Sequence, residues 1–419
     1  MERYTGGEVI DRLDDDQGFG AERFAATLIR HADLYDPEPR GVVDVLVVGE
    51  RVVSIAPRLS RPRLGPGALV HVVDLRGARL VPGFIDMHVH LAGGGGEGGF
   101  LHRTPAVPLS ALAAAGTTTA VGLLGTDGVT RSVQELLATV RAVNDAGLTA
   151  YMYTGAYELP TRTITGSVRA DIVLIDRVLG TGEIALSDDR SSHPSEDDLA
   201  HLAAETRVGG LLSGKAGILH LHMGAGRRAL EPVLTLLRER DLPPSMFVPT
   251  HVNRNRRLLE QAVVLAEAGG AIDLTAGIDP PGVDHPQVPA ARALRELCEQ
   301  GVPLERITIS SDAGGSLPVF DAAGNLLGID VGRPNMLWQT ARLVHTREAL
   351  PLQAALAAVT LNPARRLRLP RKGRVAPGCD ADLVSLDAEL GVDRVWARGA
   401  LVARGGRALL RGPFEGAFA

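Results

Sequence analysis

In the middle of this 419-residue chain, short apolar runs alternate with helical patterns, and this alternation constrains the fold more than any other feature. Eight successive β/α units predict a closed parallel barrel. The eight apolar runs span residues 84–90, 117–125, 149–157, 183–188, 218–223, 246–251, 271–276 and 307–312. We therefore expect an α/β protein with a (β/α)8 TIM-type barrel over residues 81–367. In such barrels the chemistry takes place at the C-terminal ends of the strands.

The two ends of the chain have a different texture, with short β-type runs separated by turn residues. Four runs come before the barrel, at residues 26–31, 42–48, 51–56 and 70–75, and three follow it, at 382–386, 394–398 and 400–403. Two separated all-β pieces predict one small β-sandwich domain, built from residues 25–80 and 368–419. Residues 1–24 are predicted to form a flexible N-terminal extension.

The composition is that of an ordinary soluble globular protein, with 45% hydrophobic and 22% charged residues. A formal net charge of −5 gives no reason to expect nucleic acid or an anionic membrane as a partner. No apolar stretch is long enough to span a bilayer, and the acidic N-terminus does not resemble a signal peptide. Cys298 and Cys379 lie far apart without metal-ligand spacing. We expect a cytoplasmic protein without structural disulfides.

Candidate metal ligands lie at the ends of the predicted strands. His88 and His90 close the first run, and residues i and i+2 of a strand point to the same side. Neutral imidazole is a usual zinc ligand. Further candidates in four later runs are Glu183, His222, His251 and Asp312. Four histidines with carboxylates at one rim predict a metal site, whereas His220, one layer deeper than His222, is expected to be a core residue.

These residues resemble the amidohydrolase superfamily, and the surrounding strings resemble its isoaspartyl dipeptidase (β-aspartyl peptidase) family. The superfamily-type motifs are Pro82-Gly83-Phe84-Ile85-Asp86-x-His88-x-His90, Asp312, Thr360-x-Asn362-Pro363-Ala364 and Pro377-Gly378-x-Asp380-Ala381-Asp382-Leu383. The more specific strings lie at residues 90–97, 122–127, 154–157, 162–167, 250–255 and 310–316. The resemblance extends from about residue 26 to residue 415.

The resemblance implies a hydrolase with two Zn2+ per subunit and a homo-oligomeric assembly. His88, His90 and Asp312 would hold one zinc ion, and His222 and His251 would hold the other. A carboxylate and a hydroxide would bridge the two metals. Paired metals lower the pKa of bound water toward about 7 and polarise the scissile carbonyl. Asp312 would take a proton from that water and pass it to the leaving amine, unless it is only a ligand.

The chain departs from the family at the bridging position, where the family has a carbamylated lysine. Its only lysines, Lys215 and Lys372, lie outside the matching string, which contains Glu183 instead. The charge of the bridge is kept, but the carboxyl group of Glu lies roughly 3–4 Å closer to the backbone. The string has one extra residue beside Gly182, and a β-bulge would need one to bring the backbone inward. We expect Glu183 to bridge the metals. The rival readings are a mononuclear or inactive site, or Asp188 or Asp189 as the bridge.

The same resemblance implies a β-Asp-X dipeptide as the small-molecule substrate, which has one ammonium and two carboxylates. Glu97 would bind the ammonium, and Arg190 and Arg254 would clamp carboxylates. Tyr157 would hydrogen-bond the carbonyl oxygen as it becomes an oxyanion. The remaining predicted substrate contacts are Gly95, Thr126 and Ser316. The alternatives are an N-acyl amino acid or cyclic-amide hydrolase on the same scaffold, or an inactive scaffold.

Overall fold

The computed structural model describes residues 24–63, 65, 69–277, 287–320 and 326–416. Apart from Phe24, the predicted N-terminal extension lies outside the described residues. Within the described part of the chain, no helix combines the length and apolar character needed to cross a membrane.

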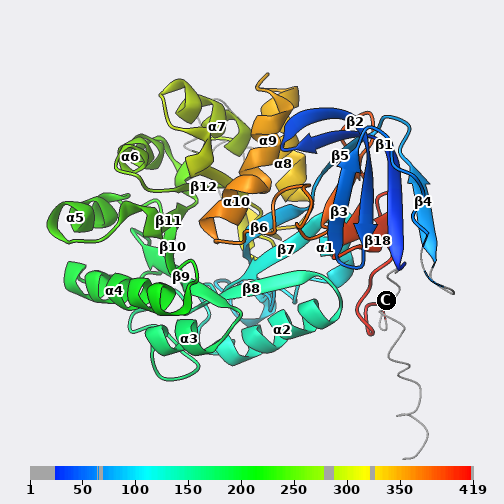
Figure 1. The fold of residues 1–419 in the computed structure, drawn as a ribbon. Coiled ribbons are helices and arrows are strands. Elements are labelled where there is room, and N and C mark those ends of the chain that lie inside the picture. Colours follow the sequence, from blue (N-terminus) through cyan, green and yellow to red (C-terminus); the bar gives the residue numbers. More distant parts are fainter. Residues whose placement is uncertain (1–23, 64, 66–68, 278–286, 321–325, 417–419) are drawn as a thin grey trace, which may run out of the picture.

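Each of the eight predicted central runs overlaps a strand, but the run predicted at 183–188 covers only the second part of its strand, which begins at Val178. The strands are β6 (Phe84–Val89), β7 (Thr117–Gly122), β8 (Thr149–Thr154), β9 (Val178–Leu186), β10 (Ile218–Met223), β11 (Phe247–Thr250), β12 (Ile272–Thr275) and β13 (Ile307–Ser310). Strands β6 to β11 form one parallel sheet in chain order, and β12 pairs in parallel with β13. A parallel bridge between Val89 and Ala313 links the end of β13 back to β6. The mixed α/β arrangement is therefore as expected, with parallel strands alternating with helices (Figure 1).

The helices lie on the outside of these strands (Figure 1). They are α1 (Leu109–Ala115), α2 (Val133–Asp145), α3 (Val168–Leu174), α4 (Glu196–Ser213), α5 (Glu231–Glu239), α6 (Arg256–Glu267), α7 (Ala290–Glu299), α8 (Met336–Thr346), α9 (Leu352–Val359) and α10 (Leu361–Arg366). Side-chain caps fix several starts; at α4, Ser195 and Asp198 form a capping box.

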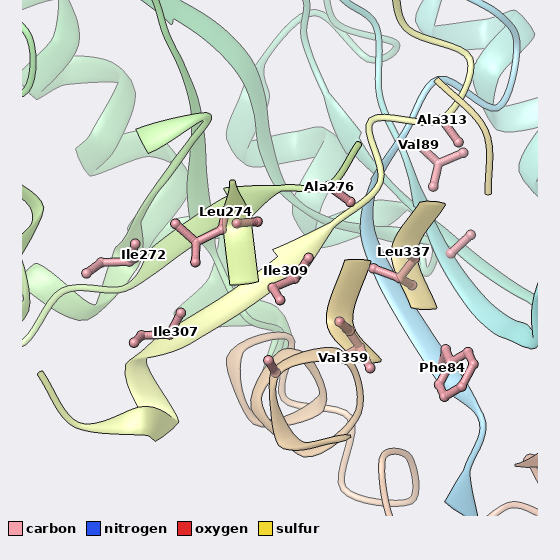
Figure 2. Close-up of a cluster of buried hydrophobic side chains, with 14 of the residues drawn as sticks. Phe84, Val89, Ile272, Leu274, Ala276, Ile307, Ile309, Ala313, Leu337 and Val359 are labelled. Atoms are coloured by element: carbon pink, nitrogen blue, oxygen red, sulfur yellow. The ribbon is translucent and has the colours of Figure 1, made fainter. Parts of the chain in front are cut away.

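The central strands are buried because helices cover one side and packed side chains fill the other. In β6, β7 and β10 every residue is buried. Figure 2 shows part of this core, where Ile272 and Leu274 of β12 and Ile307 and Ile309 of β13 pack in one cluster with Val359 of α9. This packing fixes the strand ends, where the candidate ligands lie.

Both ends of the chain contribute to one nine-stranded, β-sandwich-like sheet, in which the two β-rich pieces meet. Its strands are β1 (Ala26–Asp36), β2 (Glu38–Val48), β3 (Arg51–Ala56), β4 (Val70–Asp74), β5 (Arg79–Pro82), β16 (Leu383–Leu386), β17 (Val392–Ala397), β18 (Ala400–Arg404) and β19 (Arg407–Ala408). The two pieces meet where β5 pairs with β16, with Val81 opposite Val384. The sequence reading missed β5, β19 and the hairpin of β14 (Ser316–Phe320) and β15 (Leu326–Val331).

Both lysines have structural partners. Lys372 is buried, and its Nζ lies 2.5 Å from Asp382, 2.9 Å from Asp380 and 2.8 Å from Thr149 Oγ1 at the base of β8. It thus ties the nine-stranded sheet to the central strands. Lys215 follows α4, and its Nζ donates to the carbonyl of Ile172 in α3. Neither lysine is a bridging candidate.

Candidate metal centre

The six predicted metal ligands converge in one buried cluster at the C-terminal ends of the central strands. They are His88 in β6, His90 just after β6, Glu183 in β9, His222 in β10, His251 just after β11 and Asp312 two residues after β13. Three strands and the first residues of three loops thus build the cluster, as expected for parallel strands with aligned carboxyl ends.

The carboxylate of Glu183 lies between two pairs of histidines. Its Oε1 is 3.6 Å from His88 Nε2 and 3.6 Å from His90 Nε2. Its Oε2 is 3.2 Å from His222 Nδ1 and 3.6 Å from His251 Nε2. Each oxygen therefore faces one pair, which is the arrangement that a carboxylate bridging two metals needs.

Asp312 completes the group around the first histidine pair. Its Oδ1 lies 3.2 Å from His88 Nε2 and 3.1 Å from His90 Nε2. Neighbouring ligand atoms of a tetrahedral zinc with bonds of about 2.0–2.1 Å lie roughly 3.3–3.4 Å apart. The observed separations of 3.1–3.6 Å match that spacing. His88, His90 and Asp312, and likewise His88, Glu183 and His251, are groups able to hold a metal ion.

Buried polar atoms in the cluster lack ordinary hydrogen bonds. Within the described part of the chain, His88 Nε2, Glu183 Oε1 and Asp312 Oδ1 make none of acceptable geometry, although all are buried. Buried polar atoms are normally paired, so three that face one another fit the donor set of a cation. The residues present thus fit a bound metal cation.

The electrostatics of the cluster favour added positive charge. Burial lowers the pKa of His88, but Glu183 and Asp312 outweigh it and raise that pKa to about 9. Burial would raise the pKa of Asp312, but His88 and His90 hold it below its ordinary value. The pKa of Glu183 is likewise held well below its usual range, against burial, by His88 and His222. Both carboxyl groups are therefore ionised and attract cations.

Glu183 reaches the histidines because β9 bulges beside it. Thr181 pairs with Leu219 and Ile184 with Leu221, so Gly182 and Glu183 together oppose the single residue His220. This confirms the predicted bulge. Gly182 has φ 153°, and a Cβ there would lie 2.7 Å from the carbonyl oxygen of His220. Only glycine allows this close approach of the two strands.

Most of the ring nitrogens that point away from Glu183 have partners of their own. His88 Nδ1 lies 2.9 Å from His220 Nε2, and His251 Nδ1 lies 2.6 Å from Thr275 Oγ1. His222 Nε2 lies 3.1 Å from Asp188 Oδ2. Such outer partners orient the imidazole ligands of metals. The expectation that His220 is buried is correct, but its ring also contacts a candidate ligand.

Beside the cluster, four of the predicted substrate contacts meet at Glu97. Glu97 Oε1 accepts from Thr126 Oγ1 at 3.1 Å and from Arg190 Nη1 at 3.0 Å. Glu97 Oε2 accepts from Ser316 Oγ at 3.1 Å. Glu97 follows a glycine-rich turn in which Gly95 has φ 68° and bridges to Arg103. Gly95 therefore shapes the loop, and no side-chain contact joins it to the group.

Asp188 connects this group to the metal cluster. Its carboxylate accepts from Arg190 Nε at 2.8 Å and Arg190 Nη2 at 2.9 Å, and lies 3.6 Å from Arg254 Nη1. Arg254 Nη1 also donates to the carbonyl of Met223 at 2.8 Å. Asp188 thus occupies one edge of Arg190, whose Nη1 faces Glu97 on the other side.

Tyr157 lies next to the candidate ligand His222, with its hydroxyl 2.7 Å from His222 Nδ1. Burial, with Glu183 close by, raises the pKa of Tyr157 well above its ordinary value. The hydroxyl therefore keeps its proton and can act as a hydrogen-bond donor.

Three residues with clear structural roles escaped the sequence reading. Asp188 was considered only as a bridge, although its place two residues before Arg190 was a usable signal. Thr275 gave no signal apart from its position at the end of β12. Arg131 gave none: it is buried and donates to the carbonyls of Gly94 and Thr104, which pins the glycine-rich turn.

Comparison with known proteins agrees with this geometry. The amidohydrolase family model matches residues 250–402. The crystal structure of a β-aspartyl dipeptidase from Fervidobacterium islandicum AW-1, in complex with β-Asp-Leu, superimposes with a TM-score of 0.84. It is 40% identical in sequence, and the match covers 92% of this chain and 98% of that one.

Curated relatives carry another activity in their names. A dihydroorotase of Solibacter usitatus is 31% identical over 172 residues, which are 39% of this chain and 35% of that enzyme. The chain thus matches about a third of that relative's length. A dihydroorotase of Anaeromyxobacter is 27% identical over 388 residues, covering 83% of this chain and 84% of that enzyme.

Fold, cluster and comparisons define a hydrolase of the amidohydrolase superfamily, which acts on amide bonds. Hydrolases of this superfamily depend on metals, and the His, Glu and Asp groups of this chain are suited to bind them. Within the superfamily, the chain belongs to the isoaspartyl (β-aspartyl) dipeptidase family.

Proposed function

We propose that this protein is a dipeptidase that hydrolyses the β-linked amide of β-Asp-X dipeptides with the help of two zinc ions. The observation that carries the proposal is the group of Glu97, Arg190 and Arg254 beside the buried histidines. The substrate has one ammonium and two carboxylates, so it requires one anionic contact and two strong cationic ones. The chain offers these three charges together next to the metal ligands.

In this proposal His88, His90 and Asp312 would hold one metal, and His222 and His251 would hold the other. Glu183 would contribute its carboxylate to both, in the place of the family's carbamylated lysine. When bound, paired zinc ions lower the pKa of a water molecule toward about 7 and polarise the carbonyl to be attacked.

The chain's own residues would handle the protons and the developing charge. Asp312 is ionised, so its carboxylate can accept a proton from water. It would then deliver that proton to the nitrogen of the leaving amine, which completes the addition of water across the amide. Tyr157 would donate its hydroxyl proton in a hydrogen bond to the carbonyl oxygen as that oxygen gains charge.

The proposed substrate-binding side chains differ in which of their polar atoms are already engaged by neighbouring residues. The Nε and Nη2 edge of Arg190 is engaged by Asp188, so Arg190 would meet a carboxylate through its Nη1 side. Glu97, at 22% side-chain exposure, would exchange its contact with Arg190 for the substrate ammonium. Thr126 and Ser316 would add hydroxyl donors. Gly95 would let backbone N–H groups approach the ligand closely.

We also infer that the eight central strands form a (β/α)8 barrel. The bridge between Val89 and Ala313, which joins the last strand to the first, supports this. So does the arrangement of the helices outside the strands (Figure 1). The domain limits that we propose remain 25–80 with 368–419 for the β-rich domain, and 81–367 for the barrel.

The test is hydrolysis by the zinc-loaded protein of β-Asp-Leu, α-Asp-Leu, N-acetyl-leucine and dihydroorotate, measured as kcat/KM for each. We expect cleavage of β-Asp-Leu alone. As a matched variant, Glu97→Gln should lose activity toward β-Asp-Leu mainly through KM while keeping its zinc. Equal rates on both aspartyl linkages would contradict the proposal, as would activity only on the acetylated or cyclic compound. A protein that binds no zinc would instead be the inactive scaffold.

A further inference from the structure

We propose that His220, whose ring contacts Nδ1 of His88, fixes the tautomer of His88 and thereby sets how tightly the site binds metal. The inference rests on the proposed function, because it requires His88 to be a metal ligand. It assigns a positioning role to a side chain that the sequence presents as part of the core.

The geometry divides the two nitrogens of His88 between different neighbours. His88 Nε2 faces Asp312 at 3.2 Å and Glu183 at 3.6 Å. His88 Nδ1 lies 2.9 Å from His220 Nε2, and both rings are fully buried. Nε2 is therefore the nitrogen that faces the candidate metal site, and Nδ1 is the nitrogen that contacts His220.

Imidazole chemistry then determines where the protons lie. A neutral imidazole carries a proton on one nitrogen and a lone pair on the other. If His88 Nε2 is to offer its lone pair to a metal, Nδ1 must carry the proton and needs an acceptor. At 2.9 Å that acceptor is His220 Nε2, so the proton of His220 lies on its own Nδ1. One hydrogen bond thus fixes the tautomers of both rings.

His220 is held firmly enough for this role. Its ring stacks on that of Tyr153, with centroids 5.0 Å apart and an interplanar angle of 22°. Its backbone faces the bulge of β9, where a Cβ on Gly182 would lie 2.7 Å from the His220 carbonyl oxygen. His220 therefore contacts His88 and also lies opposite the bulge that brings Glu183 inward.

A neutral acceptor also suits the charge of this site. Metal-bound histidines often donate to a carboxylate or a backbone carbonyl. Here Glu183 and Asp312 already contribute two buried negative charges beside His88. A neutral imidazole at His220 orients the ring without adding a third.

The test compares zinc binding by the wild type and by three variants, measured as zinc per chain and as affinity against a competing chelator. His220→Phe keeps a ring against Tyr153 but has no acceptor, and we expect one zinc to bind about 10–100-fold more weakly. His220→Gln retains an acceptor oxygen and should lose less. The matched control, Tyr153→Phe, removes a hydroxyl that has no hydrogen-bond partner within the described residues and should bind zinc like the wild type.

Thermal unfolding of the metal-stripped proteins separates binding from folding, and His220→Met replaces the Phe variant if that one does not fold. Wild-type zinc affinity in His220→Phe or His220→Met would overturn the inference and leave His220 a core residue. A loss in His220→Gln as large as in His220→Phe would overturn it too. Absence of zinc from the wild type would instead refute the proposed function.

Discussion

Shortening the proposed bridge by one methylene gives a sharp test of the metal centre. In Glu183→Asp the carboxylate keeps its charge but retracts by about 1.5 Å. The present distances from its oxygens to the histidine nitrogens are 3.2–3.6 Å. They would grow to roughly 4.5–5 Å, whereas neighbouring ligands of one zinc lie roughly 3.3–3.4 Å apart.

No zinc ion could then contact position 183 and a histidine together unless the bulged strand moved. Loss of even an outer-shell partner costs about 10–100-fold in metal affinity or activity, so the loss of a direct ligand should exceed about 100-fold. We expect Glu183→Asp to retain at most one zinc per chain and to lose activity on β-Asp-Leu accordingly. Glu183→Gln keeps the reach and removes the charge, so it should also lose a metal.

The assay is zinc content by mass spectrometry together with kcat/KM for β-Asp-Leu. Glu158→Asp is a matched control, because Glu158 pairs with Arg162 rather than with the cluster. Wild-type apo-protein should also regain full activity with zinc in CO2-depleted buffer, without help from bicarbonate. Two tightly bound zinc ions in Glu183→Asp, or a bicarbonate requirement of the wild type, would refute the reasoning.

Three further predictions concern proton transfer, substrate binding and stability. Asp312→Asn should keep most of its zinc but lose at least about 100-fold in kcat on β-Asp-Leu, because the amide cannot accept the proton; near-normal kcat would make Asp312 a ligand only. Arg254→Lys should lower kcat/KM because an ammonium cannot reproduce the guanidinium fork, and full tolerance would exclude a carboxylate clamp. Lys372→Met should lower the free energy of unfolding by about 3–5 kcal/mol in urea titrations, because it leaves the buried Asp382 without its cation; a change below about 1 kcal/mol would contradict this.

Much of the fold could be predicted because strand pattern and burial are local properties of the sequence. All eight central runs overlap a strand, and β10 has the predicted bounds. The other predicted strands extend beyond the C-terminal ends of the observed strands, and several candidate ligands lie in these overextended parts. His251 and Asp312 have φ of 61° and 54°, so the chain has already left the strand there. Such conformations cost roughly 1–3 kcal/mol and persist where the surroundings fix them.

The candidate site was predictable only as far as residue type and strand position determine it. The positions of the candidate ligands follow from matching strings at strand ends, whereas the contact of Glu97 with Arg190 emerges only from the structure. The contact of His220 with His88 depends on the rotation of two rings in different strands, which no local pattern encodes. The pairing of Asp188 with Arg190 and His222 depends likewise on how the loop after β9 folds back.

The reach of Glu183 into the cluster depends on at least three residues rather than one. Glu183 supplies the charge, Gly182 supplies the backbone that can bulge, and His220 supplies the surface on which the bulge rests. Any side chain at position 182 would collide with the carbonyl of His220. A lysine restored at position 183 would carry its carbamate roughly 3–4 Å too far, because the bulge has already moved the backbone inward. Glu183→Lys should thus remain inactive with bicarbonate unless Gly182 is removed as well.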